Sequence, residues 1–143
     1  MQTYVIDTSV VVKWYNTTRE QHIEYASKIL NALKNGKINI IVPNILVVEL
    51  INACINGKLL PQDRIEMMVD NFFLLPLINK EITPSLVKTT TQIMQKFHLT
   101  SYDALFVALA KQEKCKLISD DSKGHGKITD GSVIMLKNYM TLK

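Results

Sequence analysis

The sequence predicts an α/β fold in which a parallel sheet of about five strands lies between two layers of helices. Short apolar runs alternate along the chain with longer segments of helical periodicity, which is typical of a parallel sheet covered on both faces. The 143 residues, 47% of them hydrophobic, suit one ordinary domain with its own core. We therefore expect a three-layer α/β/α sandwich that forms a single domain over residues 1–143.

The apolar runs and the helical patterns place the expected elements in order. Strands are predicted near 3–7, 38–42, 72–76, 115–119 and 133–136. Helices are predicted near 9–15, 20–35, 44–56, 62–71, 84–97 and 102–113. Helix 20–35 carries one apolar stripe and should pack by one face, whereas helix 44–56 is apolar nearly all round and should be central.

Several helix ends carry local signals. Thr83 before Pro84 is typical of an N-cap followed by proline in the first turn. Ser101 is a second N-cap candidate, which would place Asp103 in the first turn of its helix. Gly36 fits a helix stop. The two glycines within residues 121–127 suggest a mobile loop.

The charge balance favours a polyanionic partner. The chain has 17 basic and 13 acidic residues, a formal net charge of +4. Neutralising four of the acids with a metal would leave 17 basic against 9 acidic residues, or +8. Such an excess of basic residues suits a nucleic-acid partner, although many domains that bind no nucleic acid are also mildly basic.

The sequence favours a cytoplasmic protein. Asp7 and Lys13 interrupt the apolar N-terminal stretch, so it does not read as a signal peptide, and no apolar run is long enough for a membrane span. Cys54 and Cys115 lie in apolar contexts and are expected to be buried thiols without a disulfide framework.

Four carboxylates occupy positions where an ordinary core would place apolar residues. Asp7 ends one predicted strand, Asp121 follows another, Glu49 interrupts an apolar helix, and Asp103 opens a second apolar helix. An unpaired buried carboxylate costs several kcal/mol, roughly, so each needs a positive partner. A divalent metal ion shared by all four carboxylates would supply the positive charge that they need.

The fold would bring these four side chains together. Sites in an open parallel sheet form beyond the carboxyl ends of the strands, where Asp7 and Asp121 lie. A helix start favours the anion of Asp103, and the longer Glu49 side chain could reach the same crevice. Their wide spacing rules out an EF-hand loop, and oxygen-only ligands favour Mg²⁺ or Mn²⁺ over zinc.

In their order and spacing, these motifs resemble the PIN domain, the small nuclease fold of VapC-type toxins from prokaryotic toxin–antitoxin pairs. The matching segments are Val5-Ile6-Asp7-Thr8-Ser9, Val47-Val48-Glu49-Leu50, Leu99-Thr100-Ser101-Tyr102-Asp103-Ala104-Leu105 with Ala108-Leu109-Ala110, and Leu117-Ile118-Ser119-Asp120-Asp121. The resemblance implies a Mg²⁺- or Mn²⁺-dependent endoribonuclease, a homodimer and a small inhibitory antitoxin.

The resemblance also assigns roles within the site. Asp7, Glu49, Asp103 and Asp121 would bind metal and carry catalysis of phosphodiester hydrolysis. Ser9 and Ser119 would support the site through hydrogen bonds. The doubled acid departs from the family pattern of Thr or Ser, any residue, then Asp, so Asp121 is nominated as ligand and Asp120 is expected to line the rim or cap the loop.

Other candidate residues favour structural roles. Lys13 could reach a substrate phosphate, but a solvated lysine is the better interpretation. Trp14 and Tyr15 could stack on a base, although packing is favoured for both. His125 would at most contact substrate from its loop.

A dimer interface is expected within residues 62–97. Met67, Met68, Phe72 and Phe73 supply more apolar bulk than a small core needs, so they are interpreted as core or interface.

Three other functional classes are considered. A haloacid-dehalogenase-type enzyme would want a second aspartate at position 9, where this chain has Ser9, and a phospho-receiver domain would want acids that this chain lacks. A PIN-like module that binds RNA or protein without cutting is the remaining alternative, although all four acids are present.

Overall fold

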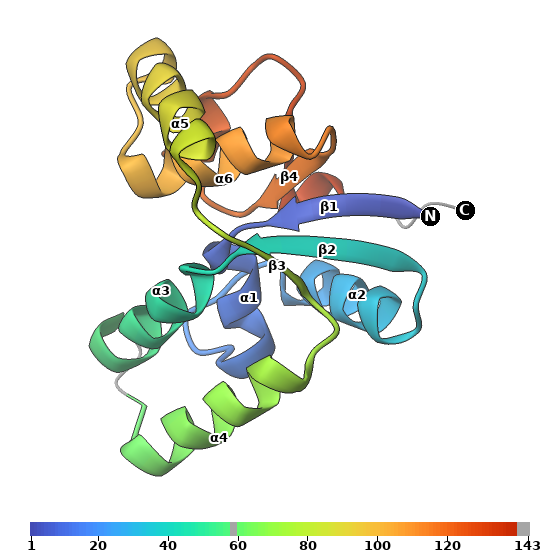
Figure 1. Ribbon diagram of the computed structural model, residues 1–143. Helices are drawn as coiled ribbons and strands as arrows, with labels where there is room; N and C mark the ends of the chain where they lie inside the picture. Colours follow the sequence, from blue (N-terminus) through green and yellow to red (C-terminus); the bar gives the residue numbers. More distant parts are fainter. Residues whose placement is uncertain (58–59, 140–143) are drawn as a thin grey trace.

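The computed structural model describes residues 1–57 and 60–139 and contains a five-stranded, fully parallel sheet (Figure 1). The strand order is β3-β2-β1-β4-β5. The strands are β1 (Gln2–Ile6), β2 (Ile38–Pro43), β3 (Ile78–Lys80), β4 (Lys116–Ser119) and β5 (Val133–Met135). The chain turns in opposite directions from β1 and from β4, so a topological switch point lies between these two central strands.

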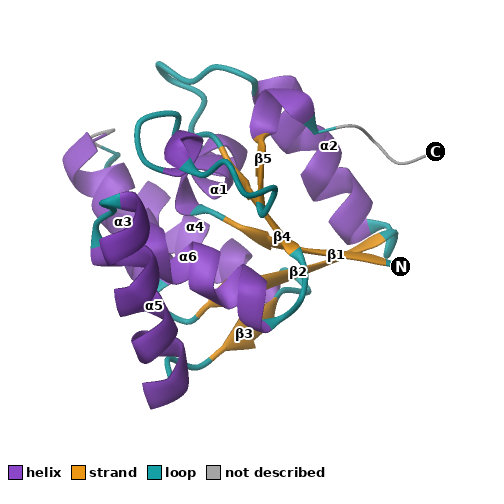
Figure 2. Cartoon of the chain, turned by 90° about the horizontal axis from the view of Figure 1, so that it is seen from above, coloured by secondary structure: helices purple, strands orange, loops and turns teal. Residues whose placement is uncertain are grey.

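Helices cover both faces of the sheet (Figures 1 and 2). The α-helices are α1 (Thr8–Tyr15), α2 (Ile23–Lys34), α3 (Leu46–Asn52), α4 (Gln62–Leu74), α5 (Pro84–Phe97) and α6 (Ser101–Gln112). Helices α1 to α4 lie on one side of the strands and α5 and α6 on the other, which confirms the predicted α/β/α sandwich with a parallel sheet (Figure 1).

The core lies where α6 crosses the central strands. Every residue of α6 from Ala104 to Ala110 is buried, and α6 packs on β1, β2 and β4. Ile6 of β1 pairs with Ile118 of β4, and both side chains are fully buried. Dense packing at this point holds the carboxyl ends of β1 and β4 in fixed relation.

One predicted strand is wrong. Residues 72–76 were expected to form the third strand, but α4 runs to Leu74 and the strand follows at Ile78–Lys80. Ile65, Met68 and Phe72 are the buried residues of α4, at a helical spacing, while Phe73 is exposed. The apolar run at 72–75 is therefore the end of an amphipathic helix.

Two further expectations for helices need correction. Helix 44–56 is not central: α3 ends at Asn52, a π-helix (Ala53–Gly57) follows, and Val48 is 56% exposed. Thr100, rather than Ser101, caps α6 by accepting a hydrogen bond from the Asp103 amide. The predicted Thr83 cap is confirmed, and Gly36 has φ +68° just past the end of α2.

None of the described helices is both long enough and apolar enough to cross a bilayer.

Candidate metal centre

Two of the predicted acids lie at the carboxyl ends of the central strands. Asp7 directly follows β1, is 6% exposed and caps α1, because its Oδ2 accepts a hydrogen bond from the Ser9 amide at 3.1 Å. Asp121 lies two residues beyond β4, and its Oδ1 accepts from the Gly124 amide at 3.0 Å. Both acids are thus held by backbone donors at the switch point of the sheet.

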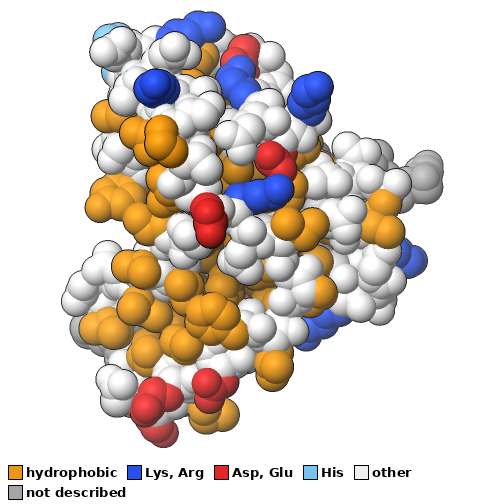
Figure 3. Space-filling model, viewed as in Figure 1, with side chains coloured by type: hydrophobic (Ala, Val, Ile, Leu, Met, Phe, Trp, Pro, Cys, Tyr) orange, Lys and Arg blue, Asp and Glu red, His pale blue; other side chains and the backbone are white. Residues whose placement is uncertain are grey.

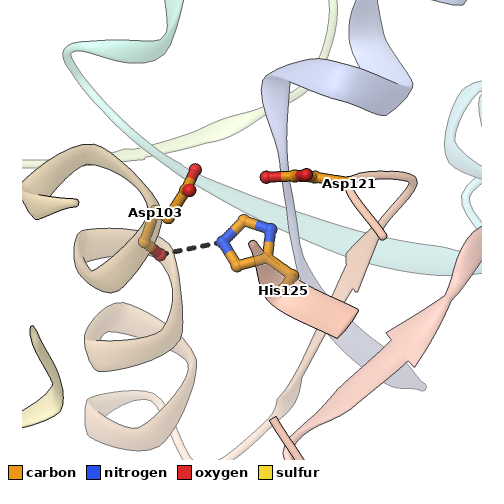
Figure 4. Close-up of side chains that lie close together, drawn as sticks. All are labelled: Asp103, Asp121 and His125. Atoms are coloured by element: carbon orange, nitrogen blue, oxygen red, sulfur yellow. Dashed lines mark hydrogen bonds between the residues drawn. The ribbon is translucent and has the colours of Figure 1, made fainter. Parts of the chain in front are cut away.

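Asp103 faces Asp121 across a small gap (Figure 4). It lies in the first turn of α6, where the helix dipole favours a negative charge. A Cβ atom added to Gly124 would lie 2.5 Å from Asp103 Oδ2 and would also collide with Asp121 Oδ2. Gly124 therefore keeps open the space between the two carboxylates, which any side chain would fill.

Glu49 completes the carboxylate cluster, by which we mean Asp7, Glu49, Asp103 and Asp121. Its Oε1 accepts a hydrogen bond from the Thr8 hydroxyl at 3.2 Å. Burial, together with the negative charge of Asp7, raises the pKa of Glu49 to about 7. Burial also raises the pKa of Asp103, and the charges of Asp121 and Asp7 add to that effect. The negative charges of the cluster thus act on one another.

The carboxylate cluster fits a divalent cation. No Lys or Arg in residues 1–57 and 60–139 forms an ion pair with any of its four members. Carboxylate oxygens are the donors that Mg²⁺ and Mn²⁺ prefer. A cation would also offset the repulsion and desolvation that raise the pKa values of Glu49 and Asp103.

His125 lies at the centre of this region, and sequence reasoning missed its place. It is fully buried rather than exposed on a mobile loop. Its Nε2 donates to the Asp103 carbonyl oxygen at 2.8 Å, because a carbonyl only accepts. Its Nδ1 lies 2.6 Å from the Ser119 hydroxyl and 3.9 Å from Asp7 Oδ2.

His125 orients the cluster rather than serving as an obvious ligand. One donor atom from each of Asp103, Asp121 and His125 lies within 4.8 Å of the others, a spacing compatible with a shared ion. Both ring nitrogens of His125, however, already have hydrogen-bond partners. The imidazole therefore ties the start of α6 to the end of β4.

The two predicted supporting serines fix the backbone around Asp120 and Asp121. Ser9 Oγ accepts a hydrogen bond from the Asp120 amide at 2.9 Å, and Ser119 Oγ accepts from the Asp121 amide at 3.1 Å. Because His125 Nε2 carries the proton that it donates to Asp103, Nδ1 of the neutral imidazole is an acceptor for the Ser119 hydroxyl. Residues 121–127, expected to be mobile, are closed by hydrogen bonds, including the Gly126 amide to the Asp121 carbonyl at 3.1 Å.

Asp120, expected to line the rim or cap the loop, takes part in an ion cluster with Lys13, Glu20 and His22 and also lines a surface pocket together with Asp121. Lys13 Nζ lies 2.8 Å from Asp120 Oδ2 and 2.7 Å from Glu20 Oε1, and His22 Nδ1 lies 3.0 Å from Asp120 Oδ1. Lys13, expected to be solvated, is 4% exposed. Although burial lowers the pKa of Lys13, its hydrogen bonds to Asp120 and Glu20 outweigh that effect and raise it.

Comparison with known proteins identifies the family of the chain. The PIN domain family matches residues 4–128, so the chain belongs to the PIN domain family. None of the curated proteins searched matches the chain.

Among solved structures, VapBC2 from Rickettsia felis, bound to a DNA fragment from its promoter, is 15% identical with a TM-score of 0.69. The alignment covers 94% of this chain and 98% of that one. DNA-bound VapBC from Salmonella typhimurium is 16% identical with a TM-score of 0.68, covering 95% and 99%. VapC20 from Mycobacterium tuberculosis, described as a Sarcin-Ricin loop cleaving toxin, is 12% identical with a TM-score of 0.63, covering 81% and 86%. These likenesses support the fold.

We expect Lys13→Met to lower the free energy of unfolding by about 3 kcal/mol, because it removes the ammonium group from two partly buried carboxylates. The matched control is Lys111→Met, which breaks an exposed pair with Asp130 of similar length, 2.7 Å, and should cost about 1 kcal/mol or less. Urea denaturation of both variants measures the difference. Equal costs would contradict a structural role for the Lys13 cluster.

Proposed function

We propose that this protein is a Mg²⁺- or Mn²⁺-dependent endoribonuclease that hydrolyses RNA phosphodiester bonds. The observation that carries the proposal is the carboxylate cluster, which lies at the switch point of a PIN domain without a Lys or Arg partner among the described residues. The basic excess of the chain, +4 in formal net charge, suits a polyanionic substrate.

Asp7, Glu49, Asp103 and Asp121 are the residues that would hold the metal. A bound Mg²⁺ would acidify a water molecule and offset charge on the phosphate oxygens. Gly124 leaves room between Asp103 and Asp121, and His125 keeps the Asp103 turn in place. The chain would thus need no covalent nucleophile.

We further propose that the protein is the toxin of a toxin–antitoxin pair and acts in the cytoplasm. Its structural neighbours come from VapBC complexes, and 94–95% of this chain aligns with the two named above. An antitoxin could block the site by placing a basic side chain against the carboxylate cluster.

The alternatives have less support. A haloacid-dehalogenase-type site would need a second aspartate at position 9, where this chain has Ser9. The Ser9 hydroxyl instead accepts a hydrogen bond from the Asp120 amide. A silent binding module would have no need for a carboxylate cluster in which burial and neighbouring negative charge raise the pKa values of Glu49 and Asp103.

Asp7→Asn should abolish RNA cleavage, because it removes one charge from the most buried acid of the cluster. EDTA should abolish cleavage by the unmodified protein, and Mg²⁺ or Mn²⁺ should restore it. Cleavage of a labelled single-stranded or looped RNA, followed on a denaturing gel, measures both effects. Undiminished cleavage in EDTA would refute the metal mechanism, and binding without cleavage under either metal would favour the silent module.

Asp121→Asn should weaken Mg²⁺ binding more than tenfold, whereas Asp120→Asn should leave it nearly unchanged. Asp121 faces Asp103 across Gly124, while Asp120 is paired with Lys13 and His22. Asp120→Asn should instead lower stability, because it leaves Lys13 with fewer negative partners. Isothermal titration calorimetry and thermal melting separate the two effects. Weaker metal binding in Asp120→Asn alone would reverse the assignment.

We propose that a second copy of the chain covers the exposed apolar face of α4. Met68 and Phe72 are buried, but Met67 is 68% exposed and Phe73 64% exposed. Hydrophobic side chains gather over α3 and α4 on one face of the molecule (Figure 3). Monomers rarely expose large apolar patches.

Phe73→Glu should therefore convert a dimer into a monomer, because it buries a charge in the expected interface. Lys28→Glu also introduces a glutamate, at an exposed site on α2 and not on α4, and should leave the dimer intact. Sedimentation equilibrium at micromolar concentration measures the mass. A monomeric unmodified protein would contradict the dimer.

A further inference from the structure

A pocket of about 580 Å³ opens beside the carboxylate cluster, between α3 and the first turn of α6. Glu49 and Thr8, which hydrogen-bond one another, belong to its wall. The pocket is therefore continuous with the candidate metal centre. Its volume lies within the range of small-ligand pockets, roughly 300–1,000 Å³.

The pocket presents an exposed aromatic ring. Tyr102 lines it and is 55% exposed. It directly precedes Asp103 in α6, and neighbouring helix positions point in different directions. Asp103 thus faces the carboxylate cluster while Tyr102 faces the adjoining space. Val48 of α3, 56% exposed, contributes an aliphatic wall to the same pocket.

The pocket also contains an oriented amide. Asn52 lies one helical turn after Val48 in α3 and lines the pocket. Its Oδ1 accepts a hydrogen bond from Asn56 Nδ2 at 2.6 Å, which leaves the Asn52 Nδ2 group as a donor for a ligand. The pocket thus combines an aromatic ring, an aliphatic side chain and an amide group in its lining.

We propose that this pocket binds one nucleobase of the RNA, next to the phosphate held at the carboxylate cluster, with the base stacked on Tyr102. The proposal rests on the ribonuclease function above and specifies how its substrate is held. A base has apolar faces and a polar edge, which match Tyr102 and Asn52. A peptide that adds as a β-strand fits less well, because the pocket walls are helices whose backbone is already hydrogen-bonded and offer no strand edge.

The test is the affinity of the protein for short fluorescent RNA oligonucleotides, with Ca²⁺ replacing Mg²⁺ so that binding is measured without turnover. Tyr102→Ala should weaken binding about tenfold or more, the usual effect of losing one stacking aromatic. Tyr102→Phe, which keeps the ring, should stay within about twofold of the unmodified protein. Tyr25→Ala on α2 removes an aromatic outside the pocket and should leave affinity unchanged.

An abasic nucleotide, placed at each position of the oligonucleotide in turn, identifies the stacked base. At one position it should weaken binding by the unmodified protein as much as Tyr102→Ala does. The abasic nucleotide at that position should not further weaken RNA binding by the Tyr102→Ala variant, because the variant has already lost the stacking contact.

The outcomes separate this proposal from the one on which it rests. If the Tyr102→Ala variant kept both metal-dependent cleavage and unchanged RNA affinity, the base pocket would be refuted but the ribonuclease function would still be supported. An unmodified protein that binds no RNA would overturn both. If Tyr102→Ala weakened only a complex with an antitoxin protein, the pocket would be a peptide site and the base assignment would be wrong.

Discussion

Repulsion among Asp7, Glu49, Asp103 and Asp121 is the constraint around which the rest of the site is arranged. The four acids come from four separate elements, so packing between those elements holds the charges together. Part of that packing is the pairing of β1 and β4 against α6, whose residues from Ala104 to Ala110 are all buried. Without a cation, burial and neighbouring charge raise the pKa values of Glu49 and Asp103, so the folded protein bears an electrostatic cost that a divalent ion would relieve.

The neighbouring residues limit that cost in two ways. His125 and Ser119 hold the backbone of Asp103 and Asp121 through hydrogen bonds, so the loop after β4 does not need a charge pair to stay in place. Lys13 takes the adjacent acid, Asp120, out of the cluster by pairing with it. The two aspartates that the sequence places side by side thus face different surroundings, one beside other acids and one beside an ammonium group.

The sequence predicted the sheet, most helices and the convergence of acids because these depend on local patterns. Strand-like runs end at Asp7 and just before Asp121, and helix starts carry recognisable caps. The strand predicted at 72–76 was wrong, because a short apolar run fits a strand and a helix end equally well. The Ile65, Met68 and Phe72 spacing was the available signal for a helix. Lys13 and His125 could not be placed, because one partner of each, Asp120 and Asp103 respectively, comes from a distant segment, and a polar, glycine-containing loop gives no local sign of burial.

In the proposed enzyme, the acids that local sequence patterns predict would carry the chemistry, whereas side chains on exposed helix surfaces would determine selectivity. The acids follow from strand ends and helix starts, positions that the fold itself makes suitable for charge. Tyr102 and Val48 instead belong to exposed helix surfaces, where core packing imposes no choice of side chain. Because Tyr102 is adjacent to Asp103, however, the capped first turn of α6 sets the backbone positions of both residues at once. A residue whose side chain the core does not constrain thus lies beside the acids, and proximity of this kind is what recognition of a base next to a bound phosphate requires.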